Sequence, residues 1–240
     1  MKQVIFTTLF VKEKNPVHAR KDVSKDLAGY IREWHLSMTI NKVNAIIFHD
    51  GLPEDLVESF TNEYVKFKQV PEIRHNACDA RWMVYAEEVK NIEPGTYIFC
   101  NDISDVVMGG NPFVENAGLA DGILYTGDEP AKLKHPWIQK RNEDLVDKLP
   151  EVYEFIKNNT ELRTLNPGII GGSYDIMKEY FTIMAEHLER GGYIAKTIDM
   201  SIHNYVARTY FDGRLKHGAP VNSTFGRQQK NRKDVWFIHK

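Results

Sequence analysis

The stretch Thr96–Val107, TYIFCNDISDVV, decides the fold. Its first residues are aromatic, β-branched or otherwise apolar, which is typical of a buried strand. Two carboxylates, Asp102 and Asp105, follow where that strand ends. Carboxylate oxygens are ligands for hard divalent ions, so this spacing fits a Mg²⁺ or Mn²⁺ site. It equally fits an Asp102 that caps the next turn and an Asp105 that pairs with a base, and spacing alone leaves both interpretations open.

Upstream of this stretch the chain alternates between the hydrophobic periods of strands and helices. Leu27, Tyr30, Ile31 and Trp34 follow the i, i+3, i+4, i+7 spacing of a helix that Asp22 or Ser24 would cap. The predicted strands are 4–9, 44–49, 65–70 and 96–100, and the predicted helices begin at 24, 53 and 77. This order predicts an α/β fold with a mostly parallel sheet and helices on both faces.

Parallel sheets of this kind bind ligands beyond the carboxyl ends of their strands. The residues predicted to lie there are Thr7-Thr8, Asp50-Gly51 and Asn101-Asp102. The sequence contains neither a G-x-G-x-x-G fingerprint after the first strand nor a G-x-x-x-x-G-K-[ST] loop. If the sheet binds a nucleotide, another group must therefore neutralise the phosphates.

The second half of the chain is rich in turns, with predicted helices near 175–190 and 199–210 and a final strand at 235–238. No internal repeat or Pro/Gly/Ser-rich linker interrupts the sequence. We therefore expect a single domain over 1–240, with a nucleotide-binding half, 1–110, and a sugar- and acceptor-binding half, 111–240.

The composition argues against nucleic-acid-binding, membrane-spanning and disulfide-rich classes of protein. Among 240 residues, 31 basic and 33 acidic side chains give a formal net charge of −2, which argues against nucleic acid as the partner. No run approaches the apolar length of a membrane span, and the N-terminal segment reads as a strand rather than a signal peptide. We expect a soluble, cytoplasmic protein. Two cysteines, Cys78 and Cys100, are too few for a disulfide framework.

Six stretches together resemble one known family: DARWMVYAEEV, YIFCNDISDVVMGGNPF, LYTGDEP, LNPGIIGGSYDIM, IDMSIHNYV and VWFIHK. Over about Asp79 to His239, their types and order are similar to those of metal-dependent nucleotide-sugar glycosyltransferases of GT-A fold. The resemblance implies the GT-A fold, a Mn²⁺ or Mg²⁺ cofactor, a nucleotide-sugar donor that is uridine-linked (UDP-glucose, for example), and a glycan or glycoconjugate acceptor.

The resemblance also implies roles for individual residues. Asp102, Asp105 and His239 would hold the metal ion, and Asp199 would be the catalytic carboxylate near the sugar and the acceptor. Thr7 and Thr8 would line the base or ribose pocket, Asp79 and Arg81 would hold the donor, and a glycine-rich turn would lie under the transferred sugar. The full donor-binding set is Thr7, Thr8, Asp79, Arg81, Asp102, Asn166, Gly168, Gly171 and Gly172.

Other readings of these residues stay open. The family's acidic motif has an arginine where Ser104 stands, and Pro167 replaces a small residue of the glycine turn. Arg81 could be half of a buried ion pair with Asp79 or Glu87. Asp199 could cap the helix that follows it, and Ser173 could cap a helix after Gly171-Gly172. Trp137, in a predicted loop, could stack on an acceptor sugar, and the basic run Arg227–Lys233 could close over a diphosphate. His203 is expected to be a packing or network residue rather than a ligand.

The predicted reaction moves a sugar from a nucleotide diphosphate to a glycan hydroxyl. If the anomeric centre inverts, a carboxylate must serve as general base, and Asp199 is the candidate. If configuration is retained, the leaving diphosphate can take the proton, and the sequence does not decide between the two. One alternative is a sugar-nucleotide pyrophosphorylase, whose Gly-rich basic signature FTTLFVKEKNP lacks. Another is a non-catalytic glycan-binding domain of the same fold.

Overall fold

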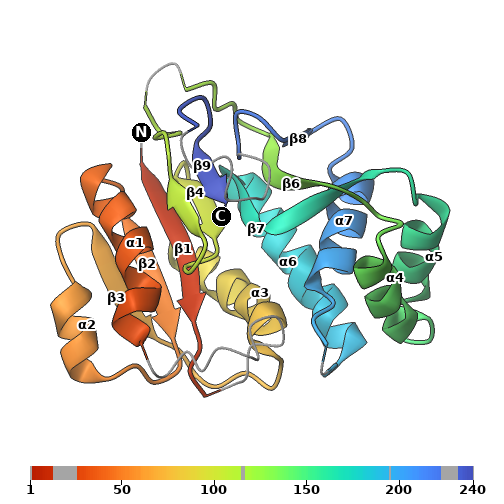
Figure 1. Ribbon diagram of the computed structural model, residues 1–240, viewed down its shortest axis with the longest axis horizontal. Helices are drawn as coiled ribbons and strands as arrows, with labels where there is room; N and C mark the ends of the chain where they lie inside the picture. Colours follow the sequence, from red (N-terminus) through yellow and green to blue (C-terminus); the bar gives the residue numbers. More distant parts are fainter. Residues whose placement is uncertain (1, 13–25, 115–116, 195, 223–231, 240) are drawn as a thin grey trace.

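A seven-stranded sheet runs through the centre of the computed structural model, in the order β3-β2-β1-β4-β7-β6-β8 (Figure 1). The structure describes residues 2–12, 26–114, 117–194, 196–222 and 232–239. The strands of this sheet are β1 (Gln3–Leu9), β2 (Ala45–His49), β3 (Val65–Gln69), β4 (Tyr97–Asn101), β6 (Leu124–Lys132), β7 (Arg163–Ser173) and β8 (Leu215–His217).

The chain order reverses between β1 and β4, and this reversal positions the site. From β1 the sheet runs outward through β2 and β3 on one side and through β4 on the other, all in parallel. Beyond β4, β7 is antiparallel to both β4 and β6. Since neighbouring connections diverge at such a reversal, a crevice is left at the carboxyl ends of β1 and β4.

A separate two-stranded sheet joins β5 (Val106–Met108) to β9 (Phe237–His239). The strands are antiparallel, and Val106 pairs with His239. This register brings a histidine from the last described strand beside the segment that follows β4.

Helices cover both faces of the central sheet because its parallel strands carry apolar side chains on both faces. Ile5 packs with α1 residues such as Trp34, whereas its neighbour Phe6 packs in the cluster of α3 and α6 on the opposite face. The helices are α1 (Leu27–Ile40), α2 (Glu54–Phe60), α3 (Ala77–Glu88), α4 (Pro136–Asn142), α5 (Pro150–Asn158), α6 (Tyr174–Gly191) and α7 (Asp199–Tyr210), with 3-10 turns at Val89–Asn91 and Glu143–Leu145.

Side chains at the helix starts fix where the helices begin. The Asp26 carboxylate accepts from the Gly29 N–H at 2.7 Å, and the Asn76 side chain accepts from the N–H groups of Cys78 and Asp79. Proline begins both α4 and α5, where its missing N–H costs no helical bond. The Asn76 cap matters most for function, because it sets the direction in which α3 presents its first turn to the crevice.

The predicted fold class, an α/β fold with a mostly parallel sheet covered by helices, is confirmed, with local differences. The cap of α1 is Asp26, while Asp22 and Ser24 lie outside the described residues, as does most of the basic run Arg227–Lys233. The final strand begins at Phe237 rather than 235. Five helices and strands were not predicted: β5, β6, β8, α4 and α5.

The predicted glycine turn is the larger difference, because residues 163–173 form the long strand β7. A Cβ on Gly171 would lie 2.3 Å from the Phe99 ring, and one on Gly172 would lie 2.7 Å from the Ile123 carbonyl oxygen. These glycines let β7 pack closely against its neighbours within the sheet.

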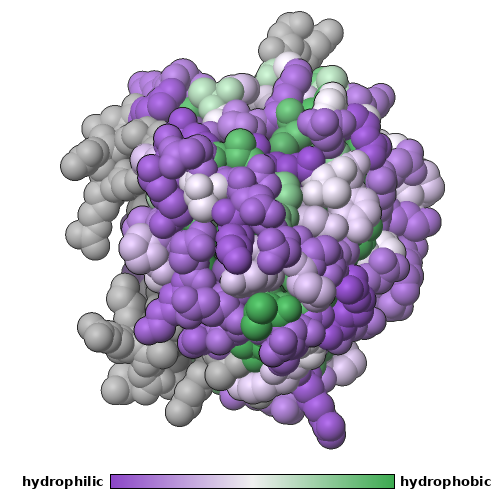
Figure 2. Space-filling model, turned by 90° about the vertical axis from the view of Figure 1, so that its right-hand side faces the viewer, coloured by the Kyte–Doolittle hydropathy of each residue, from purple (hydrophilic) through white to green (hydrophobic). Residues whose placement is uncertain are grey.

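The surface seen from the side of α4 and α5 is mostly hydrophilic, with small separate apolar areas (Figure 2). In the described part of the chain, no helix combines the length and the apolar character that a bilayer crossing needs.

Candidate functional site

A cavity of about 390 Å³ opens at the carboxyl ends of β1 and β4. This volume lies within the range of small-molecule sites in proteins. Its described wall carries four carboxylates, Asp102, Asp105, Glu129 and Asp199, and one arginine, Arg81. A cavity with this excess of acidic groups favours cations, and it would bind a diphosphate only with added positive charge.

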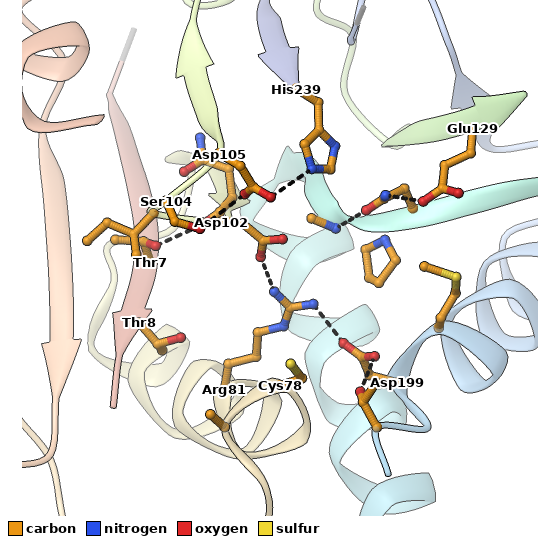
Figure 3. A pocket seen from close by; sticks show the side chains of 18 of the residues that line it. Thr7, Thr8, Cys78, Arg81, Asp102, Ser104, Asp105, Glu129, Asp199 and His239 are labelled. Atoms are coloured by element: carbon orange, nitrogen blue, oxygen red, sulfur yellow. Dashed lines mark hydrogen bonds and ion pairs between the residues drawn. The ribbon is translucent and has the colours of Figure 1, made fainter. Parts of the chain in front are cut away.

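Asp102, Asp105 and His239 form an acidic group with histidine at one wall of this cavity (Figure 3). One ligand atom from each lies within 4.8 Å of the others. Asp102 follows β4, Asp105 precedes β5, and the β5–β9 pairing supplies His239, whose Nε2 lies 3.6 Å from Asp105 Oδ2. Two carboxylates and one imidazole gathered in this way are donors that would suit Mn²⁺ or Mg²⁺.

The surroundings of His239 raise its pKa. Burial by itself lowers the pKa, since the ring is 3% exposed, but the hydrogen bond and charge of Asp105 and the charge of Asp102 more than reverse this effect. The imidazole therefore lies in a field that favours positive charge, which a metal ion would equally satisfy.

Gly168 of β7 makes room for the acidic group. A Cβ at this position would lie 2.7 Å from Asp102 Oδ2 and 3.1 Å from His239 Cε1. The Gly168 carbonyl also accepts from the Asp102 N–H at 3.0 Å, and the Asn166 side chain accepts from the Gly168 N–H at 2.7 Å. A residue without a side chain is thus required where β7 passes the two carboxylates.

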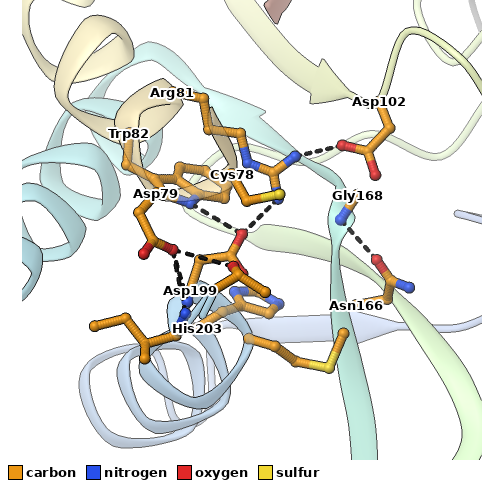
Figure 4. A network of polar contacts seen from close by, with 12 residues as sticks. Cys78, Asp79, Arg81, Trp82, Asp102, Asn166, Gly168, Asp199 and His203 are labelled. Carbon is orange, nitrogen blue, oxygen red and sulfur yellow. Dashed lines mark hydrogen bonds and ion pairs between the residues drawn. The ribbon is translucent and has the colours of Figure 1, made fainter. Parts of the chain in front are cut away.

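Arg81, on the first turns of α3, bridges two carboxylates across the cavity (Figure 4). It forms an ion pair with Asp102, and its Nη2 lies 2.7 Å from Asp199 Oδ2. Its side chain is only 11% exposed. Burial disfavours the guanidinium charge, yet the two carboxylates raise its pKa well above the ordinary value. The ion-pair reading of Arg81 is therefore correct in kind, with Asp102 and Asp199 as partners instead of Asp79 or Glu87.

Asp199 begins α7 and accepts hydrogen bonds from several donors. Besides Arg81, Thr197 Oγ1 donates to it at 2.7 Å and Trp82 Nε1 at 3.4 Å. A carboxylate that holds this many donors has a stabilised charged form. A residue of α3, Asp79, holds the backbone around Asp199 in place.

Asp79 supplies that support from behind the cavity wall. It is 1% exposed and does not line the cavity. Its Oδ1 accepts from the N–H groups of Ile198 and Asp199 and shares the single Thr197 hydroxyl proton with Asp199, while Oδ2 accepts from Asn76 Nδ2. The carboxylate thus binds the turn that begins α7.

The structure brings most of the predicted site residues together and leaves others outside. Those that line the cavity are Thr7, Thr8, Arg81, Asp102, Asp105, Asn166, Gly168, Asp199 and His239. Asp79, Gly171 and Gly172 do not line it, and Gly171 and Gly172 lie within the pairing of β7 with β4. Asp50 also lies apart from it, because its carboxylate binds the N–H groups of Val11 and Lys12.

Several lining residues had no role in the sequence analysis, notably Glu129, His135 and Met200. Glu129 lies in the quoted stretch LYTGDEP, which was the available signal for it. Trp137, expected in a loop, lies in the first turn of α4 and lines the cavity. His203 is fully buried between Thr126 and Tyr180, and burial lowers its pKa to about 3, so it is a neutral network residue as expected.

Comparison with solved structures finds the same architecture in the galactosyltransferase LgtC, in a crystal structure with donor and acceptor sugar analogues. The TM-score is 0.54 with 11% sequence identity, and the match covers 98% of this chain and 86% of that one. The chain has a GT-A fold.

This GT-A fold is what the six-stretch resemblance implied, and that prediction is confirmed. At 11% identity the likeness concerns the fold alone. No protein-family model matches the sequence, and no curated protein matches it.

Proposed function

We propose that this protein is a glycosyltransferase that moves a sugar from a nucleotide-diphosphate sugar, uridine-linked, to a hydroxyl of a glycan. The observation that carries the proposal is the group Asp102, Asp105 and His239 beside Arg81, at the carboxyl ends of the strands where the sheet order reverses. The likeness to a galactosyltransferase fold supports it.

The metal ion of this proposal is Mn²⁺ or Mg²⁺, held by Asp102, Asp105 and His239. Such an ion, when bound, supplies the positive charge that stabilises a departing diphosphate. The donor set fits it, because hard oxygen ligands and one imidazole converge over a glycine that leaves the space open. The acidic excess of the cavity wall is a second argument, since an anionic donor would otherwise be repelled.

Arg81 would bind the donor diphosphate through charge-assisted hydrogen bonds. In the structure its guanidinium pairs with Asp102 and Asp199. A bound diphosphate would replace one of these carboxylates as the partner of Arg81. In the proposed donor complex, Arg81 would turn from Asp102 toward the diphosphate. Thr7 and Thr8 at the end of β1 would line the nucleoside part of the donor.

The proton of the acceptor hydroxyl has two possible destinations. In the transfer, the bond from the anomeric carbon to the diphosphate oxygen breaks and a bond to the acceptor oxygen forms. Asp199 can take the released proton only after Arg81 has moved away, because the guanidinium stabilises its charged form. If Arg81 stays, the diphosphate oxygen is the remaining acceptor. Asp79 would position Asp199 without contact with the substrate.

Calorimetric titration of UDP, UDP-glucose and GDP, each with and without Mn²⁺, tests the proposal. We expect metal-dependent binding that the variant Asp102→Asn loses. The exposed Asp147→Asn is the matched control, because it makes the same chemical change on the surface. If no nucleotide binds in the presence of metal, the proposed function is wrong and the fold stands alone. Binding without release of nucleoside diphosphate on any acceptor would favour a glycan-binding domain.

A further inference from the structure

The cavity continues past the metal-binding group to a wall whose residues have no part in the donor and metal binding proposed above. This wall comes from the end of β6, from α4 and from the start of α7, and it is lined by Glu129, His135, Trp137, Ile138 and Met200. In Figure 3, Glu129 lies on the opposite side of the Asp105–His239 group from Thr7 and Thr8. The wall is therefore distinct from the part of the cavity that ends at β1.

Trp137 provides a large flat surface in this wall. The Arg141 guanidinium carbon lies 3.5 Å from the centre of its ring, so one side of the indole is occupied. Arg141 does not line the cavity, whereas Trp137 does and is half-buried. Arg141 thus holds the ring from one side, and the indole forms part of the cavity wall. A rigid aromatic surface of this kind suits the C–H face of a sugar ring.

Glu129 supplies a fixed hydrogen-bond acceptor beside that surface. Its Oε1 accepts from Asn166 Nδ2 at 2.5 Å, which holds the carboxylate at the cavity wall. Hydroxyl groups donate to carboxylates, whereas phosphates and carboxylates are repelled by them. With Asp199 also in the wall, this part of the cavity is acidic and excludes acidic sugars.

We propose that Trp137 and Glu129 form the acceptor subsite and bind a neutral sugar ring, stacked on the indole with a hydroxyl on the Glu129 carboxylate. This inference rests on the proposed transferase function and names the chemistry of its acceptor. The apolar side chains of Ile138 and Met200 complete the surface around the ring. A nucleotide base is a poorer occupant, since its diphosphate would have to pass the Glu129 carboxylate.

Tryptophan fluorescence reads this subsite directly. Of the four tryptophans, all in the described part of the chain, Trp34, Trp82 and Trp236 are buried and Trp137 is half-buried. Acrylamide quenching therefore reports mainly on Trp137. The probes are the methyl β-glycosides of glucose, galactose and mannose and methyl β-glucuronide, each added with and without UDP and Mn²⁺. We expect at least one neutral glycoside to protect the ring from acrylamide and the glucuronide to protect it less.

Calorimetry with the protecting glycoside then tests the two residues. Trp137→Leu should weaken glycoside binding by about tenfold and Trp137→Phe by less, because the smaller ring keeps part of the stacking surface. UDP–Mn²⁺ affinity should not change in either variant. Glu129→Gln should bind methyl β-glucuronide as tightly as the neutral glycosides, because the repelling carboxylate is gone. The control Tyr193→Leu removes an aromatic residue that is 59% exposed and does not line the cavity.

Three results would overturn the subsite: no protection by any neutral glycoside, equal glycoside affinity for Trp137→Leu and Tyr193→Leu, or equal protection by glucuronide in the unmodified protein. These differ from failure of the proposed function. A protein that binds no nucleotide refutes the transferase, whereas the titrations without UDP still decide whether a neutral sugar binds at Trp137.

Discussion

Arg81 and Asp199 are joined at 2.7 Å although 118 positions separate them in the sequence. The contact ties the first turns of α3 to the start of α7 across the cavity, and the same guanidinium pairs with Asp102. Two carboxylates thereby share one buried cation. In the proposed mechanism Asp102 binds the metal ion and Asp199 is the candidate base. The effect of the Arg81 charge on metal binding can therefore be measured by comparing a neutral substitution with a charged one.

Replacement of Arg81 by glutamine should tighten Mn²⁺ binding to the nucleotide-free protein. The guanidinium now competes for Asp102, and removal of a unit charge this close to the site should raise metal affinity by about tenfold. The same variant should bind UDP-sugar more weakly, because the phosphate contact is lost. Calorimetry on the folded fraction, checked by circular dichroism, measures both affinities.

The control for this prediction is Arg81→Lys, which keeps the charge. It should bind Mn²⁺ with nearly the affinity of the unmodified protein. If the glutamine and lysine variants bind the metal equally well, Arg81 does not compete for Asp102.

Replacement of Asp79 by asparagine should destabilise the protein and lower its activity. Asp79 Oδ1 accepts from the N–H groups of Ile198 and Asp199, and Oδ2 accepts from Asn76, so an amide nitrogen on either side faces a donor. An unsatisfied buried group of this kind costs about 1–3 kcal/mol of unfolding free energy. Urea denaturation measures the loss, with Asp147→Asn as the surface control. A variant as stable as the control would show that the turn before α7 is held by other contacts.

Replacement of Gly168 by alanine should weaken the metal site more than the fold. The added methyl group would lie 2.7 Å from Asp102 Oδ2, which must move away from the other ligands. Gly127→Ala is the matched control on β6, because its Cβ would have only ordinary contacts, the nearest at 3.4 Å. We expect Mn²⁺ affinity to fall at least about tenfold for Gly168→Ala and to stay unchanged for Gly127→Ala. Equal affinities would place the ion away from Asp102.

His203 should lower the stability of the protein as the pH decreases below 6.5, against an opposite contribution from Asp79, whose pKa burial raises to about 7. Burial lowers the pKa of His203 from 6.5 to about 3, so between these values the unfolded chain binds a proton that the folded protein does not. The contribution is fully present above pH 6.5 and is lost at no more than about 1.4 kcal/mol per pH unit down to pH 3.

Urea denaturation at pH 7 and pH 5 measures this loss. His203→Gln has no titrating ring at this position and, on lowering the pH from 7 to 5, should lose less free energy of unfolding than the unmodified protein, or gain more. A difference as large as that of the unmodified protein would assign the pH dependence to other groups.

The sequence was informative where function depends on strand ends, and less so where it depends on contacts between distant segments. Thr7, Thr8 and Asp102 were found because the ends of parallel strands meet at one edge. Trp137 was expected in a loop because α4 has seven residues, too few for a helical period to be recognised. Asp79 resembled a donor ligand, and its position behind the wall follows from contacts with residues 197–199 that no local pattern encodes.

The β6 segment shows a third limit. Its pairing with β7 shifts register at Thr126/Gly127 and again between Asp128 and Lys132, so the alternation that identifies a strand is interrupted. Glu129 lies within this irregular part, and its side chain reaches the cavity for that reason.

Trp137 lies outside the central sheet, so the residues around it can be substituted more readily than those of the metal-binding group. The groups around Asp102 and His239 depend on strand pairing, so an exchange there would disturb the sheet. Residues 133–142 lie between β6 and α5 and include α4. Leu133 and Ile138 of this segment are buried in the core, so substitution is tolerated at its exposed positions. Under the proposed function, substitution of Trp137 and of exposed residues near it would change which acceptor the enzyme uses. The donor and the reaction would stay the same, so enzymes of this fold could acquire new acceptors through this segment alone.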